Sequence, residues 1–210
     1  MLSASGSAAP GTDWPRFLAS LALAPASPAA AATEAPPASH ACVLSDLSGY
    51  ALIEVSGPDA ESFLHAQLSS DVRALGPDRC QLATYNSPKG RVLATLLLWR
   101  SGEGFLLQVP AALATSLAKR LSLFVLRSKV RLAAAGERLI RFGLAGAQAG
   151  ELLDQAGLAV PTADFGLVSG ALSTNAMQPD AVLRLDQGRI AEVGTLELAQ
   201  RIARTGFAGA

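Results

Sequence analysis

The chain has 210 residues, of which 50% are hydrophobic, and its 17 Lys and Arg are balanced by 17 Asp and Glu. This composition excludes a protein that is disordered throughout, and about 170 ordered residues can bury a core without disulfides or metals. The zero net charge argues against generic high-affinity binding to nucleic acid, which draws on clustered cations, and leaves room for a local basic patch.

The two cysteines, Cys42 and Cys80, stand far apart and belong to no CxxC pair. The chain alone therefore predicts no zinc or iron–sulfur site. Sparse thiols suit a reducing compartment, so we expect a cytoplasmic protein.

Residues 1–41 differ in composition from the rest and are predicted to be a flexible tail. Residues 21–39, LALAPASPAAAATEAPPAS, are rich in Ala, Pro and Ser, which is typical of a linker. Because no basic region precedes the apolar run and prolines interrupt it, we predict neither an export signal nor a membrane span. The apolar spacing in residues 13–23, DWPRFLASLAL, predicts a short amphipathic helix that either docks on the folded body or stays exposed.

The folded part is expected to begin with a strand and a helix. Residues 50–57, YALIEVSG, are β-rich, and Pro58 suits the first position of a helix. The recurring apolar positions in that helix predict a buried stripe of Ala60, Phe63, Leu64 and Leu68.

A hairpin, a third strand and a second helix are predicted next. Residues 79–86 and 91–100 form the hairpin around the turn SPKG, and residues 105–109, FLLQV, form the third strand. Pro110 opens the helix, whose spacing predicts a buried stripe of Leu113, Leu117, Leu121 and Phe124.

The remaining sequence mixes both kinds of element. We expect strands in 128–135, 138–146 and 180–188, and helices in 147–157 and 195–205. Because hairpins occur beside crossovers, the chain is predicted to be α+β, with antiparallel-rich sheets flanked by helices, rather than a doubly wound sheet. The segment AAAGE indicates a boundary, so we expect a first domain over 42–134 and a second over 135–210.

The turn of the predicted hairpin raises a question of function. Ser87, Pro88 and Gly90 occupy positions i, i+1 and i+3 of a type I turn, where each is favoured. This explanation does not account for Lys89 and Arg91, which flank the glycine and would suit a carboxylate or phosphate group. The alternative is a solvated hairpin tip.

Other polar residues have simple structural explanations. Arg127, Lys129 and Arg131 would share one face of a strand, as on many wet faces and protected edges. Asp71 follows a helix and suits a turn cap, and the isolated His65 predicts no metal site. No GxxxxGK[ST], GxGxxG, GxSxG or HExxH motif occurs. Chemistry alone therefore indicates an α+β ligand-binding domain.

Three blocks taken together resemble a known family. LIEVSGPDAESFLHAQLSSDV (52–72), YNSPKGRVLATLLLWR (85–100) and LSLFVLRSKVRL (121–132) look, in order, spacing and content, like the amino-terminal portion of the YgfZ family, the folate-binding relatives of the glycine-cleavage T-protein. The resemblance is good up to about residue 132 and weak beyond it. It implies T-protein-like amino-terminal domains and a tetrahydrofolate-binding accessory protein that supports assembly or repair of certain iron–sulfur enzymes, including one that modifies transfer RNA.

The resemblance also implies residues that contact folate. Tyr50 stands where the family has an aromatic residue on its first strand; the ring could stack on a flat pterin or be an ordinary half-buried aromatic. The family's LQGQLTNDV corresponds to LHAQLSSDV, which departs at His65 and Ala66, and its KGR turn is matched at 89–91. We hypothesise that the turn's cations meet the glutamate tail of folate. The expected cofactor-binding residues are Tyr50, Gln67, Asp71, Asn86, Lys89 and Arg91.

The resemblance leaves three functions open. The first is a non-catalytic accessory protein, with iron–sulfur client proteins as partners and no direct contact with nucleic acid or membrane. The second is an aminomethyltransferase, which would need an acidic residue near the folate nitrogen, whereas residues 91–99 contain no Asp or Glu. The third is a degenerate module that keeps the fold and no ligand. No catalytic residue and no metal ligand are assigned.

The family's KGCYxGQE segment does not occur in the 210 residues. We therefore expect a fragment or a truncated product, in which residues 135–210 form an incomplete second domain. Because folate lies in this fold in a channel lined by several domains, such a chain would supply one wall of it.

Overall fold

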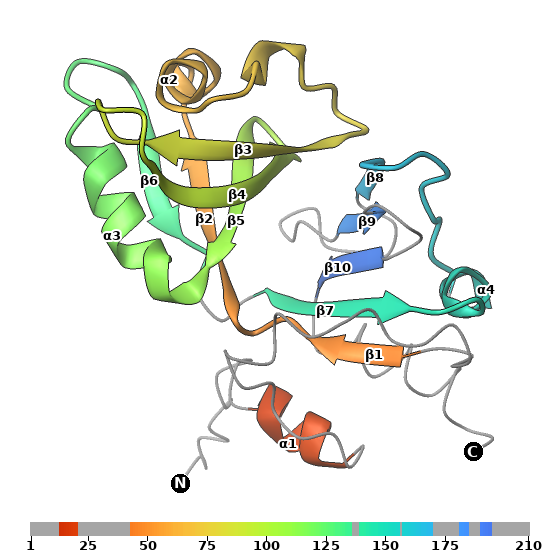
Figure 1. The fold of residues 1–210 in the computed structure, drawn as a ribbon. Helices are drawn as coiled ribbons and strands as arrows, with labels where there is room; N and C mark the ends of the chain where they lie inside the picture. Colours follow the sequence, from red (N-terminus) through yellow and green to blue (C-terminus); the bar gives the residue numbers. More distant parts are fainter. Residues whose placement is uncertain are drawn as a thin grey trace, which may run out of the picture.

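The computed structural model describes residues 13–20, 43–135, 139–155, 157–169, 181–184 and 190–194. This part of the chain forms two five-stranded sheets with helices beside them (Figure 1). The first sheet has the order β3-β4-β5-β2-β6 and the second the order β1-β7-β10-β9-β8. All their pairings are antiparallel, which confirms the predicted α+β class.

The first sheet contains the strands that the sequence predicted. Four of them agree with the prediction within two residues: β2 (Tyr50–Ser56), β3 (Cys80–Asn86), β4 (Val92–Ser101) and β5 (Gly104–Pro110). The edge strand β6 is shorter than expected and spans Arg131–Ala134. Arg127 and Lys129 precede this strand, so the predicted row of three cations on one strand face is wrong.

Two helices cover one face of the first sheet and close its main core. In α2 (Ala60–Gln67), Ala60, Phe63 and Leu64 are buried, as is Leu68 beyond its end. In α3 (Ala111–Ser122), Leu117 and Leu121 are buried and Leu113 packs against the core. Phe124 is 49% exposed because α3 ends before it, so its predicted burial is wrong.

Glycine 57 allows the chain to leave β2 and enter α2 beneath a neighbouring loop. Its φ is +114°, and a Cβ atom added there would lie 2.2 Å from the carbonyl oxygen of Lys129. The backbone N–H of Lys129 also donates to Asp59 Oδ2 at 2.7 Å. This close contact fixes the loop before β6 against the start of the helix.

The second sheet takes a strand from the beginning of the chain. Its members are β1 (Val43–Asp46), β7 (Ile140–Ala145), β8 (Leu167–Ser169), β9 (Ala181–Arg184) and β10 (Ile190–Gly194). β1 lies within the predicted first domain, 42–134, yet it pairs with β7. The two predicted domains therefore share a strand, and the division near residue 134 stays a prediction. α4 (Ala149–Gln155) lies in the helix expected over 147–157.

The two sheets are joined by a buried layer and by backbone hydrogen bonds. The fully buried Trp99 lies in this layer with Leu52, Leu97 and Leu106 of the first sheet and Leu167 of β8. The Cys80 N–H donates to the carbonyl of Phe165 at 2.8 Å, and the Leu167 N–H donates to that of Asp78 at 2.7 Å. The start of β3 thus pairs with the segment that leads into β8.

Two predicted helices near the chain ends have different outcomes. The one in 13–23 is confirmed as α1 (Asp13–Ser20), while its docking on the body stays a prediction. The rest of the predicted tail and the helix expected over 195–205 lie outside the described residues. Among the helices that are described, none combines the length and apolar character needed to cross a membrane.

We expect Gly57→Ala to lower the free energy of unfolding by about 2 kcal/mol or more, because a Cβ must displace backbone and adopt a positive φ. Urea denaturation of the 210-residue chain measures this change. Gly49→Ala is the matched control, since nothing lies within 4 Å of its added Cβ. Equal stability of both variants would contradict the role given to Gly57.

Candidate ligand-binding face

The face of the first sheet that turns away from α2 and α3 is the candidate site. Directly paired residues of antiparallel strands point to the same side. One row on this face consists of residues that are paired in succession across β3, β4, β5 and β2. They are Leu82, Leu97, Gln108 and Leu52.

This row divides the face into a covered part and an open part. On one side of it, Trp99 and Leu106 are covered by the layer between the sheets. On the other side lie the exposed Thr95 and the half-buried Tyr50. Each stands two residues from the row along its own strand, β4 or β2. Leu82 at the edge is 55% exposed. Beside Tyr50 and at the edge strand, the described part of the chain therefore leaves surface uncovered.

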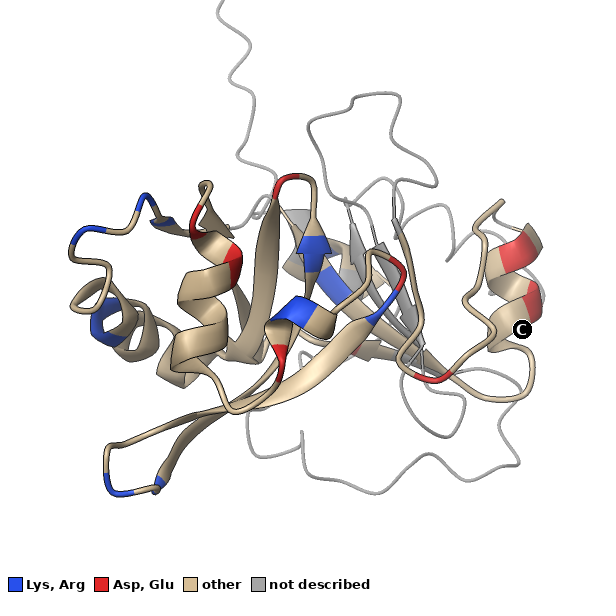
Figure 2. Cartoon of the chain, turned by 90° about the horizontal axis from the view of Figure 1, so that it is seen from above, with Lys and Arg blue, Asp and Glu red and all other residues tan. Residues whose placement is uncertain are grey.

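The hairpin tip is built as the turn residues predict. The Gly90 N–H donates to the Ser87 carbonyl at 2.9 Å, and the Ser87 N–H donates to the Arg91 carbonyl at 2.8 Å. Gly90 has a φ of +75°. This is expected for the last residue of a three-residue hairpin loop, where it follows the type I turn. Lys89 and Arg91 are exposed, and Figure 2 shows the basic tip projecting from the body.

Tyr50 and the hairpin tip lie at the same end of the sheet but are separate. β2 and β4 are both antiparallel to β5, so the first residues of both strands, Tyr50 and Val92, lie at this end. Two strand spacings, about 10 Å, separate β2 from β4. A ligand that touches both Tyr50 and the cations must therefore be elongated, as folate with its glutamate tail is.

Gln67 and Asn86 are neighbours through one bridge. Leu68, which follows Gln67, pairs with Tyr85, which precedes Asn86. The Ser69 N–H donates to the Thr84 carbonyl at 3.0 Å, so the residues that follow α2 run beside the edge strand β3. This places Gln67 and Asn86 near the base of the hairpin tip.

Asp71 has a structural role. Its Oδ1 accepts the backbone N–H of Arg73 at 3.1 Å, which caps the short helix η2 (Val72–Ala74) and confirms the predicted turn cap. The Nδ1 atom of His65 lies 3.2 Å from the same carboxylate, an ion-pair distance when the imidazole is protonated, although the contact does not have the geometry of a hydrogen bond.

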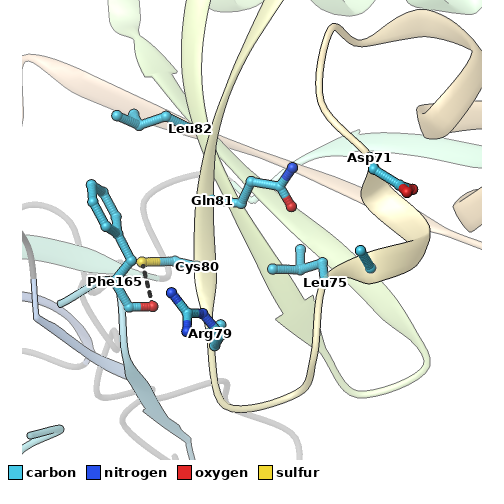
Figure 3. Close-up of a pocket in the computed structure, with 8 residues that line it drawn as sticks. Asp71, Leu75, Arg79, Cys80, Gln81, Leu82 and Phe165 are labelled. Carbon is cyan, nitrogen blue, oxygen red and sulfur yellow. Dashed lines mark hydrogen bonds between the residues drawn. The ribbon is translucent and has the colours of Figure 1, made fainter. Parts of the chain in front are cut away.

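A pocket of about 480 Å³ opens beside the edge strand (Figure 3). Its lining comes from the η2 segment, the beginning of β3 and the loop before β8. Of the six residues expected to bind folate, this pocket includes Asp71 alone. A second cavity, of about 210 Å³, includes none of them; Arg141 lines it, and burial lowers the pKa of that guanidinium.

Cys80 lies at the wall of the larger pocket as a buried, inert thiol. Burial raises the pKa of Cys80 from 9.0 to about 11. Its Sγ lies 3.5 Å from the carbonyl oxygen of Phe165, toward which Figure 3 shows it pointing. Phe165 has a φ of +57°, which turns its carbonyl toward the start of β3. The thiol therefore offers no nucleophile at neutral pH.

Sequence reasoning did not single out Gln108. Its side chain is 9% exposed in the otherwise apolar strand β5, and its buried Oε1 atom has no hydrogen-bond partner among the described residues. Such an acceptor costs about 1–3 kcal/mol unless something donates to it. The signal was present in the sequence, because Gln108 is the single polar residue in FLLQV.

The described part of the chain is thus a pair of packed antiparallel sheets with one open face. The family described as GCVT N-terminal domain matches residues 14–209, and the chain belongs to that family. This agrees with the resemblance noted in the sequence.

Similar curated proteins carry one name. The chain is 30% identical over 131 residues to the tRNA-modifying protein YgfZ of Enterobacter sp. (strain 638), a match that covers 62% of this chain and 40% of that protein. It is 33% identical over 125 residues to the tRNA-modifying protein YgfZ of Pectobacterium carotovorum subsp. carotovorum (strain PC1), covering 60% and 37%. The chain thus spans well under half the length of these relatives.

Solved structures show the same fold. The glycine cleavage system aminomethyltransferase T from Bartonella henselae matches with a TM-score of 0.68 at 20% identity, over 79% of this chain and 46% of that chain. The heterotetrameric sarcosine oxidase from Corynebacterium sp. U-96 matches with a TM-score of 0.54 at 16% identity, over 86% and 91%.

We expect Cys80 to resist alkylation in the folded chain. At pH 8, a pKa of about 11 leaves roughly a hundredfold less thiolate than an ordinary thiol has, so iodoacetamide should label a Cys42→Ser variant slowly until urea is added. Because the folded-state pKa is raised, the stability that this thiol contributes is present below pH 9.0 and is lost as the pH rises toward 11. Fast labelling without urea would contradict this burial.

Proposed function

We propose that this chain forms one wall of the folate site of a tetrahydrofolate-binding accessory protein, which supports assembly or repair of iron–sulfur enzymes and, through them, the modification of transfer RNA. The observation that carries the proposal is the uncovered part of the first sheet's face, where Tyr50 lies beside a row that ends in the exposed Leu82. The names of the YgfZ relatives support the link to transfer RNA.

The residues on this face fit a reduced pterin in three respects. A half-buried ring at Tyr50 can stack on a flat heterocycle. Among the described residues nothing donates to the Oε1 atom of Gln108, and a pterin carries amino and ring N–H groups that could do so. The cations at the hairpin tip are exposed and lie at the same end of the sheet as Tyr50, within the reach of an elongated ligand. Bound folate would bring one-carbon chemistry, and these residues would hold and orient it.

Aminomethyl transfer is not favoured by the site. That reaction needs an acidic group to move a proton at the folate nitrogen. β4 carries no acidic residue, and its one charged residue, Arg100, is bound to Glu61 of α2. The acidic residue of β2, Glu54, pairs with Leu106 and therefore lies on the covered side of the row. The described part of the face thus supports binding better than it supports transfer.

Isothermal titration with tetrahydrofolate tests the proposal. We expect the 210-residue chain to bind and Tyr50→Leu to weaken the affinity about tenfold, because the ring's stacking contact is lost. Phe124→Leu, which removes an exposed ring at the far end of α3, should leave the affinity unchanged. No binding by the parent chain would favour a degenerate module. Transfer of a methylene group from an added aminomethyl donor to tetrahydrofolate, with release of ammonia, would favour a transferase.

The hypothesis about the glutamate tail has its own test. We expect Lys89→Ala with Arg91→Ala to weaken tetrahydrofolate binding about fivefold at low salt, since two exposed cations each contribute modestly. The same double variant should bind a reduced pterin that has no glutamate tail as well as the parent chain does. An equal loss for both ligands, or no loss for either, would show that the cations do not meet the tail.

A further inference from the structure

The turn between α3 and β6 exposes large apolar side chains that cations flank on both sides in the sequence. Leu123, Phe124 and Leu126 are 67%, 49% and 86% exposed. Around them lie the cations of the last turn of α3 and of the segment that leads into β6. The basic apolar turn is defined here as residues 119–131, with the cations Lys119, Arg120, Arg127, Lys129 and Arg131.

The backbone holds these apolar side chains outward. After α3, the N–H groups of Leu123, Phe124 and Val125 each donate to the carbonyl three residues earlier, which tightens the chain. Val125 packs against the main core and anchors the turn. Leu126 follows with a φ of 41°, a conformation that a leucine rarely adopts, and this strain accompanies the most exposed apolar side chain of the set.

The charge within the turn's own segment has one sign, and the Asp59 carboxylate contacts it only at the backbone N–H of Lys129. No Asp or Glu occurs between Glu103 and Glu137, so the five cations have no acidic neighbour within their own segment. All five are exposed. Figure 2 shows Lys and Arg gathered at the end of the molecule where α3 finishes and the chain returns to the sheet, away from the acidic residues of α4. The zero net charge of the chain therefore hides a separated basic surface.

We propose that the basic apolar turn attaches the protein to the surface of an anionic lipid bilayer. The apolar side chains enter the boundary between head groups and acyl chains, and the surrounding cations pair with anionic head groups. This inference is independent of the folate site, which lies at the hairpin end of the opposite face of the sheet.

The combination of features favours a bilayer over a nucleic acid. A phosphate backbone would pair with the cations but would leave Leu123 and Leu126 with no apolar partner. Exposed apolar side chains flanked by cations suit a lipid surface, which needs no complementary shape. Interfacial attachment requires no spanning helix, so the lack of one among the described helices does not bear on it.

Vesicle co-sedimentation of the 210-residue chain tests this proposal. We expect binding to phosphatidylcholine vesicles with about 30% phosphatidylglycerol, and much weaker binding to pure phosphatidylcholine. Leu123→Ser, Phe124→Ser and Leu126→Ser together should weaken the binding at least about tenfold, because they remove the inserted apolar surface. Circular dichroism should show that this surface variant stays folded.

A pair of matched charge variants completes the test. Arg127→Ala with Lys129→Ala should weaken vesicle binding about tenfold at low salt. Lys89→Ala with Arg91→Ala removes the same number of cations from the hairpin tip and should leave it unchanged. The proposal would be overturned by an equal loss of vesicle binding in both pairs, or by binding that does not depend on vesicle charge. It would also be overturned if the chain did not sediment with vesicles while the same turn retarded transfer RNA in a gel.

Discussion

The buried layer between the two sheets is the constraint on which the rest of the structure depends. Trp99 is completely buried there, and the start of β3 is held to the segment before β8 by backbone hydrogen bonds. This layer covers one part of the first sheet's outer face, and the described residues leave the other part uncovered. The position of the candidate site is therefore decided by how far the second sheet extends across the first.

The same face of the first sheet combines the residues of the buried layer with the residues proposed to bind the ligand. Leu97 and Leu52 are buried beneath the second sheet, while Leu82 at the edge of the same row is largely exposed. Gln108 stands between these leucines with an unpaired buried acceptor. A sheet can carry both roles because cross-strand neighbours share a face while successive residues alternate. The other face, under α2 and α3, carries the main core.

Local patterns were sufficient to predict most of the first sheet. The alternation in YALIEVSG, the turn SPKG and Pro110 at the start of α3 each act within a few residues, and the elements formed where these signals stand. β8 and β10 were not predicted, because each is short and acquires its partners from distant parts of the chain. Phe124 was misassigned because helical spacing does not reveal that α3 ends two residues earlier.

The candidate site was less accessible to sequence reasoning. The family resemblance supplied six residues, but the structure distributes them over the first residue of β2, the end of α2, the cap of η2 and the hairpin tip. Their common environment depends on strand order, which residue spacing does not encode. Gln108 shows the reverse case, since its polarity is visible in the sequence while its lack of a partner is visible only after folding.

The sequence by itself determined the α+β class, the capped turns, the helix faces and the family, because these depend on residues close together in the chain. Tertiary structure alone decided that β1 joins the second sheet and which part of the first sheet the described residues leave uncovered. Those features arise from pairings between residues far apart in the chain, whose energies depend on which surfaces finally exclude water.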